Sequence, residues 1–388
     1  MGHKKVGIEV SIAAAEAAGL CDVDVVAAYP ITPQTHIVEH LSELVADGRV
    51  DAEFVPVESE HSAMSVCCGS AAAGARTFTS TAAQGLALMS EIVFIASSMR
   101  LPMVMLLANR ALSAPLSIWN DHSDIMMVRD CGWIQIFCEN GQDVYDHVFH
   151  AFRVGEDPRV SLPVMISIDG FILTHVIEPI EFWTKEMAEQ YLPKFKPLHR
   201  LHPDKVVTMG AFGMPEIYAE QKMAHNAALE NAVPVIKQGW EELADLTGRR
   251  YDAVEPYKTE GADTLILAMG SICETASLAV DRMRDEGKKV GLVKLKLWRP
   301  FPLDEIRKAL AGAKDVVVLD RSISVGGANA PVTAEIRAAM YHESQRPNIR
   351  CVVAGIGGRD VTPDDISQMV DLALTEPDQE YHMYGVRG

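Results

Sequence analysis

Short apolar runs alternate with segments of helical hydrophobic spacing along most of this chain, and this alternation limits the possible folds more than any other feature. In the first part of the chain the expected strands cover residues 23–28, 53–57, 76–81, 101–108 and 162–169, and the expected helices cover 33–46, 60–74 and 84–98. Strands that are apolar on both faces and linked by helices are typical of a parallel sheet covered on both sides. The sequence therefore predicts an α/β fold, in which ligands gather at the carboxyl ends of the strands.

The alternation is interrupted once, which divides the chain into three ranges. Residues 1–180 are expected to form the first α/β domain. Residues 181–258 are rich in proline and charge at their start, and we expect a connecting arm with a helix of its own, packed on the first domain. Residues 259–388 return to the α/β pattern and predict a second, smaller domain. Its strands are expected at 261–271, 289–296, 314–320 and 349–357.

Charge and cysteine content exclude several classes of function. The formal net charge of −18 argues against nucleic acid or an anionic membrane as a partner. No stretch approaches eighteen consecutive apolar residues, and the first ten residues lack the apolar segment of a signal peptide, so we expect a cytoplasmic protein. The seven cysteines have neither zinc nor iron–sulfur spacing, which predicts that this chain alone binds no metal.

The first junction between a strand and a helix contains two prolines, in Tyr29-Pro30-Ile31-Thr32-Pro33. Thr32 suits the N-cap of a helix, with Pro33 at the first helical position, where its missing N–H has no cost. One interpretation is a well-defined junction and nothing more. The other is a helix N-terminus with a free hydroxyl that meets an anion.

Two further strand ends carry charged residues. Glu58 and Glu60 flank the start of the helix expected at 60–74, where acidic side chains also stabilise a helix by about 0.3–1 kcal/mol each. Arg110 follows a buried strand and could be an ordinary surface arginine. At the same sheet edge as Thr32, however, it could bind a small carboxylate.

Two other motifs receive a structural interpretation. The residues of "DHSD" (121–124) could orient Arg110, but capping of the next helix is the preferred interpretation. The "GIGGRDV" segment (355–361) is a weak match to a dinucleotide-binding motif and predicts a turn that needs positive φ.

Four segments together resemble the alpha subunit of 2-oxoacid:ferredoxin oxidoreductases, especially of the four-subunit pyruvate:ferredoxin oxidoreductase (pyruvate synthase) type. They are "AAYPITPQTHIVEHLSEL" (27–44), "ESEHSAMSVCCGSAAAGARTFTST" (58–81), "ANRALSAPLSIWNDHSD" (108–124) and "DGFILTH" (169–175). Residues 267–302 are similar to the last domain of transketolase-type enzymes. The resemblance implies a thiamine diphosphate-enzyme pyrimidine-binding domain, followed by a smaller transketolase C-terminal-like α/β domain.

The resemblance also implies roles for individual residues. Glu60 matches the catalytic glutamate that lies opposite N1′ of the aminopyrimidine ring and promotes loss of the C2 proton of thiamine diphosphate. Thr32 and Arg110 match the catalytic residues that contact the substrate, the arginine holding the carboxylate of the 2-oxo acid. Pro30 and Ile31 would form walls beside the cofactor. Threonine at position 32 favours a substrate with a neutral tail, because the relative that acts on oxalate is expected to have arginine there.

Together with the resemblance, the motifs that the sequence lacks imply partner subunits. The G-D-G…N pattern that binds the diphosphate through a divalent ion is absent, so Mg²⁺ and the diphosphate are expected on a partner subunit that shares the cofactor. The 4Fe–4S clusters are likewise expected on beta-, gamma- and delta-type subunits, with ferredoxin or a similar carrier as electron acceptor. The predicted reaction is oxidative decarboxylation of a 2-oxo acid, by default pyruvate, with CoA as co-substrate.

Three alternatives stay open at this point. The same family includes enzymes for bulkier 2-oxo acids, namely phenylglyoxylate, indolepyruvate, 2-oxoisovalerate and 2-oxoglutarate. A ferredoxin-independent thiamine enzyme, such as a 2-oxoacid dehydrogenase or a transketolase, would have the same fold. A non-enzymatic scaffold would have to retain Glu60, Thr32 and Arg110 by accident.

Overall fold

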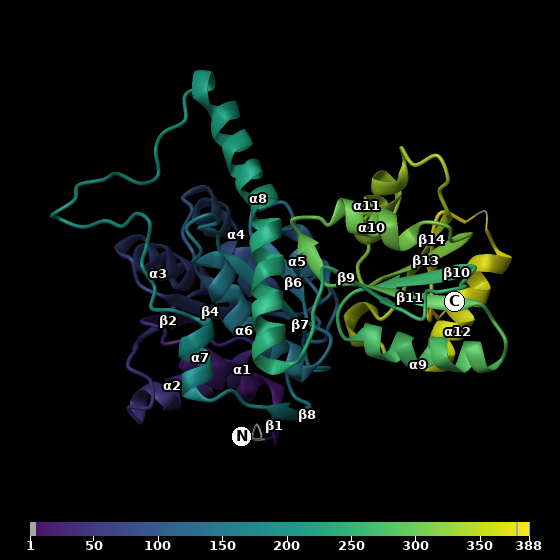
Figure 1. Cartoon of the computed structure of the whole chain (residues 1–388), viewed down its shortest axis with the longest axis horizontal. Helices are drawn as coiled ribbons and strands as arrows, with labels where there is room; N and C mark the ends of the chain where they lie inside the picture. Colours follow the sequence, from purple (N-terminus) through teal and green to yellow (C-terminus); the bar gives the residue numbers. More distant parts are fainter. Residues whose placement is uncertain (1–4, 378, 388) are drawn as a thin grey trace.

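The computed structural model describes residues 5–377 and 379–387, and its largest element is a seven-stranded sheet (Figure 1). The strand order is β12-β6-β7-β5-β4-β2-β3, and every neighbouring pair is parallel except β12 and β6. The strands are β2 (Val25–Ala28), β3 (Glu53–Pro56), β4 (Thr77–Thr81), β5 (Val104–Asn109), β6 (Ile134–Phe137), β7 (Val164–Asp169) and β12 (Leu297–Arg299). The α/β class predicted from the sequence is confirmed.

Six helices accompany this sheet in two packed groups (Figure 1). One group packs α1 (Val10–Leu20) against α2 (Thr35–Ala46) and α6 (Gly141–Gly155), and the other packs α4 (Ala83–Ser98) against α3 (Glu60–Ala73) and α5 (Ser123–Met127). None of the helices within the described ranges combines the length and apolarity that a membrane span requires.

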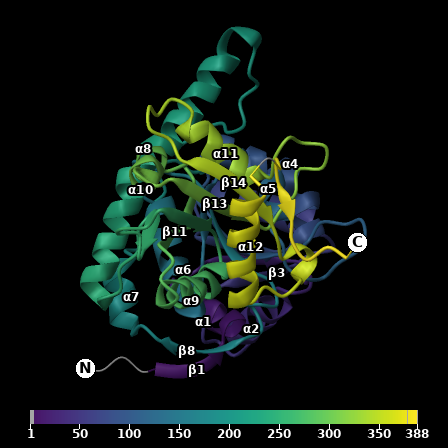
Figure 2. The ribbon, with the colours of Figure 1, turned by 90° about the vertical axis from the view of Figure 1, so that its right-hand side faces the viewer.

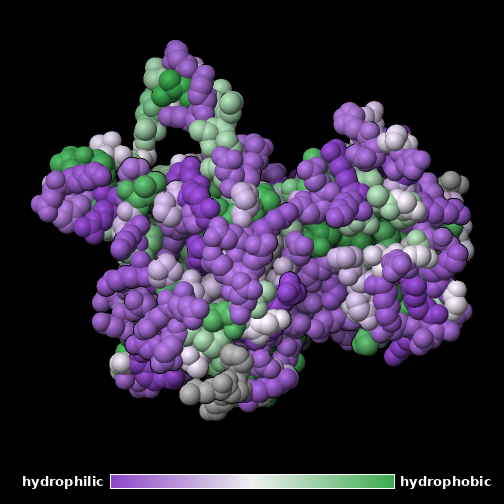
Figure 3. Space-filling model, in the orientation of Figure 1, coloured by the Kyte–Doolittle hydropathy of each residue, from purple (hydrophilic) through white to green (hydrophobic). Residues whose placement is uncertain are grey.

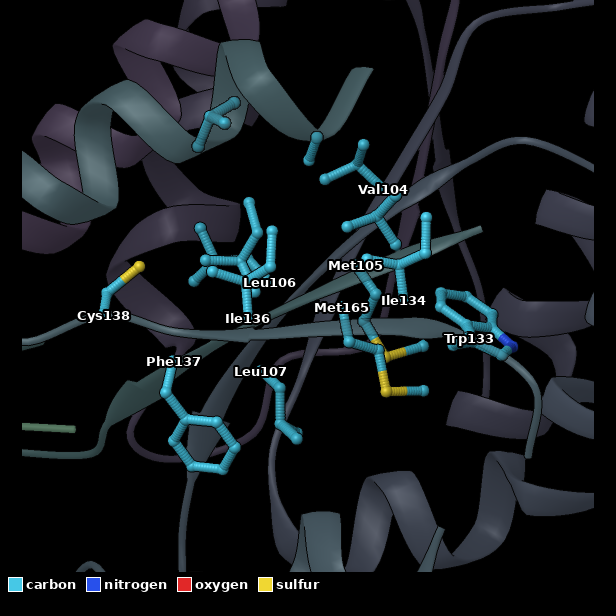
Figure 4. Packing of buried hydrophobic residues seen from close by; sticks show 14 of the residues in the cluster. Val104, Met105, Leu106, Leu107, Trp133, Ile134, Ile136, Phe137, Cys138 and Met165 are labelled. Atoms are coloured by element: carbon cyan, nitrogen blue, oxygen red, sulfur yellow. The ribbon is translucent and has the colours of Figure 1, made fainter. Parts of the chain in front are cut away.

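The core lies where β5, β6 and β7 run side by side (Figure 4). Every residue of these three strands is buried, so side chains on both faces of the sheet are withdrawn from water. Full burial of an aliphatic side chain stabilises the folded state by about 1.5–3 kcal/mol. The near-continuous apolar runs of the sequence are explained by this burial on two sides.

A second sheet of six strands forms the C-terminal part, which lies at the right of Figure 1 and faces the viewer in Figure 2. Its order is β15-β14-β13-β10-β11-β9, parallel except for β9. The strands are β9 (Val254–Tyr257), β10 (Thr264–Ala268), β11 (Val290–Leu295), β13 (Asp315–Asp320), β14 (Asn348–Val353) and β15 (His382–Met383), and the helices are α9 (Ile272–Asp285), α10 (Leu303–Leu310), α11 (Pro331–Met340) and α12 (Pro363–Thr375). Strand β12 follows β11 directly in the chain but pairs within the first sheet. The chain therefore crosses from the second sheet to the first at this point and then returns.

The segment between the sheets begins with β8 (Ile177–Glu181), which pairs with β1 (Lys5–Glu9), and continues with α7 (Lys185–Tyr191) and α8 (Pro215–Thr247). The C-terminal half of α8 packs on α6. The N-terminal half of α8 and the loop before it extend away from both sheets (Figure 1). This projection carries exposed apolar side chains, including Val206 and Phe212, and the space-filling view shows apolar residues along it (Figure 3).

The structure corrects the predicted start of the second helix. Helix α2 begins at Thr35 with Gln34 at its N-cap, so the expected helix start at Pro33 with Thr32 as cap is wrong. The N–H of Gln34 donates to the carbonyl of Ile31 at 2.9 Å, which closes a turn over residues 31–34. Thr32 therefore lies within a turn and not at a helix terminus. Helix α3, in contrast, begins at Glu60 as predicted, with Ser59 as its N-cap.

Candidate functional site

The candidate site follows from the order of four strands in the first sheet. Strands β5, β4, β2 and β3 are neighbours and all parallel, so their carboxyl ends lie at one edge. Arg110 follows β5, Thr32 follows β2, and Glu60 follows β3. The topology therefore brings the three predicted residues to the same edge of the sheet.

Glu60 is the first residue of α3 and is 8% exposed. Its carboxylate has no hydrogen-bond partner within the described part of the chain. Gly85, in the first turn of α4, lies against it: a Cβ atom at position 85 would sit 2.9 Å from Glu60 Oε1 and 2.3 Å from Thr81 Oγ1. Only glycine allows α4 to pass this close, because any side chain would fill the space beside the carboxylate.

Thr81 Oγ1 lies near this carboxylate, since both border Gly85, and Gln84 directly precedes Gly85 in the chain. Thr81 Oγ1 and Gln84 Oε1 are both buried and have no partner among residues 5–377 and 379–387. A buried polar atom without a partner costs about 1–3 kcal/mol. Together with the carboxylate of Glu60 they offer several acceptors and one hydroxyl donor to a ligand. This set fits a polar heterocycle with both ring nitrogen and amino groups.

Arg110 lies beside the turn that contains Thr32 and is 7% exposed. Its Nε donates to the carbonyl of Ser117 at 2.9 Å, and its Nη1 donates to the carbonyl of Thr32 at 2.9 Å. Burial lowers the pKa of Arg110 from its usual value, although the carboxylate of Asp124 opposes that shift. Because the pKa of arginine is so high, the guanidinium stays charged at neutral pH. Nη2 makes no hydrogen bond to any described residue, so it is available to an anion.

Asp124 connects the arginine to the start of α4. Its Oδ2 accepts from the backbone N–H of Arg110 at 3.0 Å and from that of Ala83 at 3.1 Å, and its Oδ1 accepts from Asn109 Nδ2 at 2.9 Å. Burial raises the pKa of Asp124 to about 6, although these N–H groups favour the ionised form. Ala83 lies two residues before Gly85, so Asp124 links the segment of Arg110 to the segment that contacts Glu60.

This arrangement adds the orienting role to the preferred interpretation of Asp124, which was capping of the next helix. Helix α5 has no side-chain cap at its N-cap residue, His122. Asp121 Oδ1 accepts from the N–H of Ser123, the first residue of α5, at 2.9 Å, which agrees with capping by Asp121. Asp124 has both roles: its Oδ1 accepts from the N–H of Ile125 in the first turn of α5 at 2.8 Å, and its Oδ2 accepts from the N–H of Arg110 at 3.0 Å.

The turn at residues 31–34 is held against the end of β5 by Gly170. A Cβ atom at position 170 would lie 2.4 Å from the carbonyl oxygen of Asn109 and 2.6 Å from Pro33 Cγ. Within the neighbouring stretch, Pro30 and Thr32 are exposed and Ile31 is half-buried. The side of the site that carries these three residues is therefore open to the outside.

The structure thus brings Thr32 and Arg110 into direct contact and joins them to Glu60 through Asp124 and the start of α4. Sequence reasoning did not identify Thr81, Gln84, Gly85 or Gly170 as parts of the site. A glycine inside a helical pattern, as at position 85, is a signal that could have been used. The unpaired atoms of Thr81 and Gln84 have no sequence signature, because they depend on how α3 and α4 pack.

A second group of ligating atoms lies elsewhere, in the described residues Cys138, Asp143 and His147, whose ligating atoms all lie within 4.8 Å of one another. The Lys296 ammonium donates to Asp143, and Trp240 Nε1 donates to His147 Nε2 at 3.0 Å. Burial alone would raise the pKa of Asp143, but Lys296 and His147 outweigh it and hold that pKa below its usual value. A cation therefore already neutralises the carboxylate, and the group serves as a buried ion-pair network.

Comparisons with known proteins identify the family and relatives of this chain. Residues 16–240 match the family described as "Pyruvate flavodoxin/ferredoxin oxidoreductase, thiamine diP-bdg", and residues 262–366 match "Pyruvate:ferredoxin oxidoreductase core domain II". The chain is 47% identical to pyruvate synthase subunit PorA of Methanocaldococcus jannaschii over 362 residues, covering 92% of each chain. It is 46% identical to PorA of Thermotoga maritima over 375 residues, covering 96% of this chain and 95% of that one.

A relative that is named after a different substrate is also similar to this chain. Ketoisovalerate oxidoreductase subunit VorA of Pyrococcus horikoshii is 42% identical over 370 residues, covering 95% of this chain and 93% of that one.

Two solved structures share the fold. A 2-oxoglutarate:ferredoxin oxidoreductase from Magnetococcus marinus superposes with a TM-score of 0.70 at 20% identity, covering 95% of this chain and 65% of that one. A split-gene transketolase superposes with a TM-score of 0.53 at 14% identity, covering 95% and 99%.

Proposed function

This chain belongs to the pyruvate flavodoxin/ferredoxin oxidoreductase family, and on that premise we propose that it supplies one half of the active site of a heteromeric 2-oxoacid:ferredoxin oxidoreductase, as its alpha subunit. The reaction converts a 2-oxo acid and CoA to acyl-CoA and CO2, and the electrons pass to ferredoxin. Pyruvate is the proposed substrate because the PorA relatives are named pyruvate synthase subunits. The ketoisovalerate branch is the second candidate.

The residues around Glu60 fit the aminopyrimidine ring of thiamine diphosphate. When bound, this cofactor supplies a nucleophilic carbon and an electron sink for decarboxylation. Glu60 would share a proton with the ring nitrogen, since its buried carboxylate has no partner of its own. Gln84 Oε1 would accept from the ring amino group, and Thr81 Oγ1 completes the polar set. Pro30 and Ile31 would line the opening beside the ring.

The residues around Arg110 fit the carboxylate of the 2-oxo acid. The guanidinium is fixed by two carbonyl oxygens, which leaves Nη2 to make a charge-assisted hydrogen bond. The side chain of Thr32, on the neighbouring turn, would supply a hydroxyl group on the substrate side of the site. The single observation that carries the proposal is this pairing at one sheet edge: a fixed guanidinium beside Thr32 and an unpaired buried carboxylate at Glu60.

The surface next to Glu60 fits a partner subunit. The outward face of α4 exposes Leu88, Phe94 and Ile95, and the neighbouring face of α3 exposes the small residues Ser65 and Gly69. Leu88 and Ile95 are seven residues apart and so lie on one side of α4; exposed apolar side chains are typical of interaction sites, and small residues allow close approach of another backbone. We assign this face to the beta-type subunit that would bring Mg²⁺ and the diphosphate. The gamma- and delta-type subunits with 4Fe–4S clusters, CoA and ferredoxin complete the proposed reaction.

The test compares two neighbouring glutamates in the assembled complex. Glu60→Gln is expected to abolish exchange of the C2 proton of bound thiamine diphosphate, followed by NMR, because glutamine cannot share the proton. Glu58→Gln is the matched control: Glu58 is exposed and accepts from Ser62 Oγ. Exchange at the wild-type rate in Glu60→Gln would refute the proposed role of Glu60.

A second assay separates the ferredoxin-dependent reaction from other thiamine enzymes. The purified complex is expected to reduce a viologen dye when given pyruvate and CoA. Activity with lipoamide or sugar phosphates, and none with the dye, would instead favour a ferredoxin-independent enzyme.

A further inference from the structure

The loop between β5 and α5, residues 111–122, folds back over the arginine that precedes it. Ser117 supplies the carbonyl that accepts from Arg110 Nε at 2.9 Å. The N–H of Ala111 donates to the carbonyl of Trp119 at 3.0 Å, which closes the loop. Leu116, at the tip of the loop, is 74% exposed, so the loop has little core of its own. The direction of the guanidinium therefore depends on what holds this loop.

The turn after β14 in the second sheet holds one side of the loop. The N–H of Gly358 donates to the carbonyl of Asn120 at 2.6 Å, and the N–H of Gly357 donates to Asp121 Oδ2 at 3.3 Å. The φ angles of Gly357 and Gly358 are 60° and 77°, in the left-handed region that favours glycine. A Cβ atom at position 358 would lie 2.4 Å from Trp119 Cβ, so the turn fits against the loop only without side chains.

A buried carboxylate at the end of β7 holds the other side. Asp169 Oδ1 lies 2.8 Å from His122 Nε2, and its Oδ2 accepts from Arg321 Nη1 at 3.0 Å and from the N–H of Ser271 at 2.9 Å. The N–H of His122 also donates to the carbonyl of Arg321 at 2.8 Å. Ser271 and Arg321 follow β10 and β13, so two strands of the second sheet fix the end of the loop.

The carboxylate of Asp169 is held in its ionised form. Burial alone would raise the pKa of Asp169, but Arg321 and His122 outweigh it and hold that pKa below its usual value. This ionised carboxylate accepts hydrogen bonds from the loop 111–122 and from the second sheet. Separating the loop from the second sheet would leave a buried charge unpaired, which is costly.

We propose that the C-terminal part of the chain is a positioning element for substrate binding: its turn at residues 355–358 and Arg321 fix the loop 111–122, and the loop fixes the guanidinium of Arg110. This inference rests on the proposed function, which assigns the substrate carboxylate to Arg110. Ordering a flexible loop costs about 1–2 kcal/mol per residue, so the contacts from the second sheet must offset that cost. Moving the turn is therefore expected to weaken substrate binding without touching the cofactor side of the site.

The test uses two glycine substitutions in the assembled complex. Gly358→Ala pushes a methyl group into Trp119. Gly326→Ala is the matched control, because Gly326 has a similar φ of 75° and no neighbouring atom within 4 Å of a Cβ atom. We expect Gly358→Ala to raise KM for pyruvate by about tenfold to a hundredfold, the scale of a 1 Å misplacement, with little change in kcat. Exchange of the C2 proton of thiamine diphosphate, which depends on Glu60, should stay at the wild-type rate.

A second variant covers the case in which Gly358→Ala does not assemble. Asp121→Asn turns an amide donor toward the N–H of Gly357 or of Ser123 and should also raise KM for pyruvate. Wild-type KM in both variants would overturn the inference. A variant that loses C2 exchange together with substrate binding would overturn it too, since that is general damage to the fold. If Arg110→Lys itself leaves KM unchanged, it is the proposed function that fails.

Discussion

Replacement of Arg110 by lysine perturbs the candidate substrate site most selectively. The guanidinium donates from Nε to Ser117 and from Nη1 to Thr32, and its planar shape leaves Nη2 for a ligand. A lysine ammonium carries all its donors on one nitrogen at the end of a flexible stem. It cannot satisfy both carbonyls and a bound carboxylate in the same geometry. The positive charge is kept, so the change removes the geometry of the hydrogen bonds.

The expected magnitude follows from the bond that the substrate loses. A hydrogen bond to a charged group contributes about 1.5–3 kcal/mol. At about 1.4 kcal/mol per factor of ten, Arg110→Lys should raise KM for pyruvate by roughly tenfold to a hundredfold. Arg110→Ala, which removes the charge as well, should cost about 2–5 kcal/mol in kcat/KM.

Steady-state kinetics of the assembled complex with a viologen acceptor measure both effects. Arg100→Lys is a matched control: Arg100 is also partly buried and donates to the carbonyls of Val160 and Ser161, away from the site. Burial lowers the pKa of Arg100 as it does that of Arg110. If Arg110→Lys has the KM of Arg100→Lys, Arg110 does not bind the substrate and the reasoning fails.

Three other outcomes are expected. In Asp124→Asn, an amide N–H2 group can face the N–H groups that donate to the carboxylate in the wild type, including that of Arg110. The free energy of unfolding, measured by urea titration, should fall by about 1–3 kcal/mol, and KM for pyruvate should rise. Burial, assisted by a neighbouring histidine, lowers the pKa of His150 to about 3. Above pH 6.5 His150 is neutral in both the folded and the unfolded chain, so its contribution to stability is fully present. Below pH 6.5 His150 binds a proton in the unfolded chain but stays neutral in the folded chain, which favours unfolding. Stability should therefore fall by about 2 kcal/mol from pH 8 to pH 5, a slope that His150→Phe removes from urea titrations at each pH. Lys296→Met leaves Asp143 buried without its cation and should destabilise the chain by about 3–5 kcal/mol in the same assay, whereas unchanged stability would contradict the ion-pair network.

The sequence predicted most elements of the two sheets because their residues are apolar on both faces and bounded by clear helix starts. The strand expected at 53–57 is β3, and the helix expected at 60–74 is α3. The strands that were not predicted are β6, β9, β12, β15 and the pair β1–β8. Their residues are short or mostly polar runs whose pairing depends on neighbouring strands far away in the sequence, and tertiary context of this kind outweighs local propensity.

The candidate site was predictable to the extent that it follows from strand ends. Thr32, Glu60 and Arg110 each follow a strand, and the parallel order brings them to one edge. The local geometry at Thr32 was not predicted correctly, because residues 31–34 form a turn and the helix begins only at Thr35. Asp124 was weighed mainly as a cap, since no local pattern shows that its carboxylate accepts from the start of α4. Whether these residues act in catalysis stays a prediction.

The central claim is that Glu60 and the pair Thr32–Arg110 face one cofactor and one substrate from the same sheet edge. A structure of the assembled complex with thiamine diphosphate and a 2-oxo acid analogue tests it most directly. We predict the ring nitrogen within hydrogen-bond distance of the Glu60 carboxylate and the carboxylate of the analogue on the guanidinium of Arg110. A pyrimidine ring bound away from Glu60, or an analogue whose carboxylate contacts other residues, would contradict the claim.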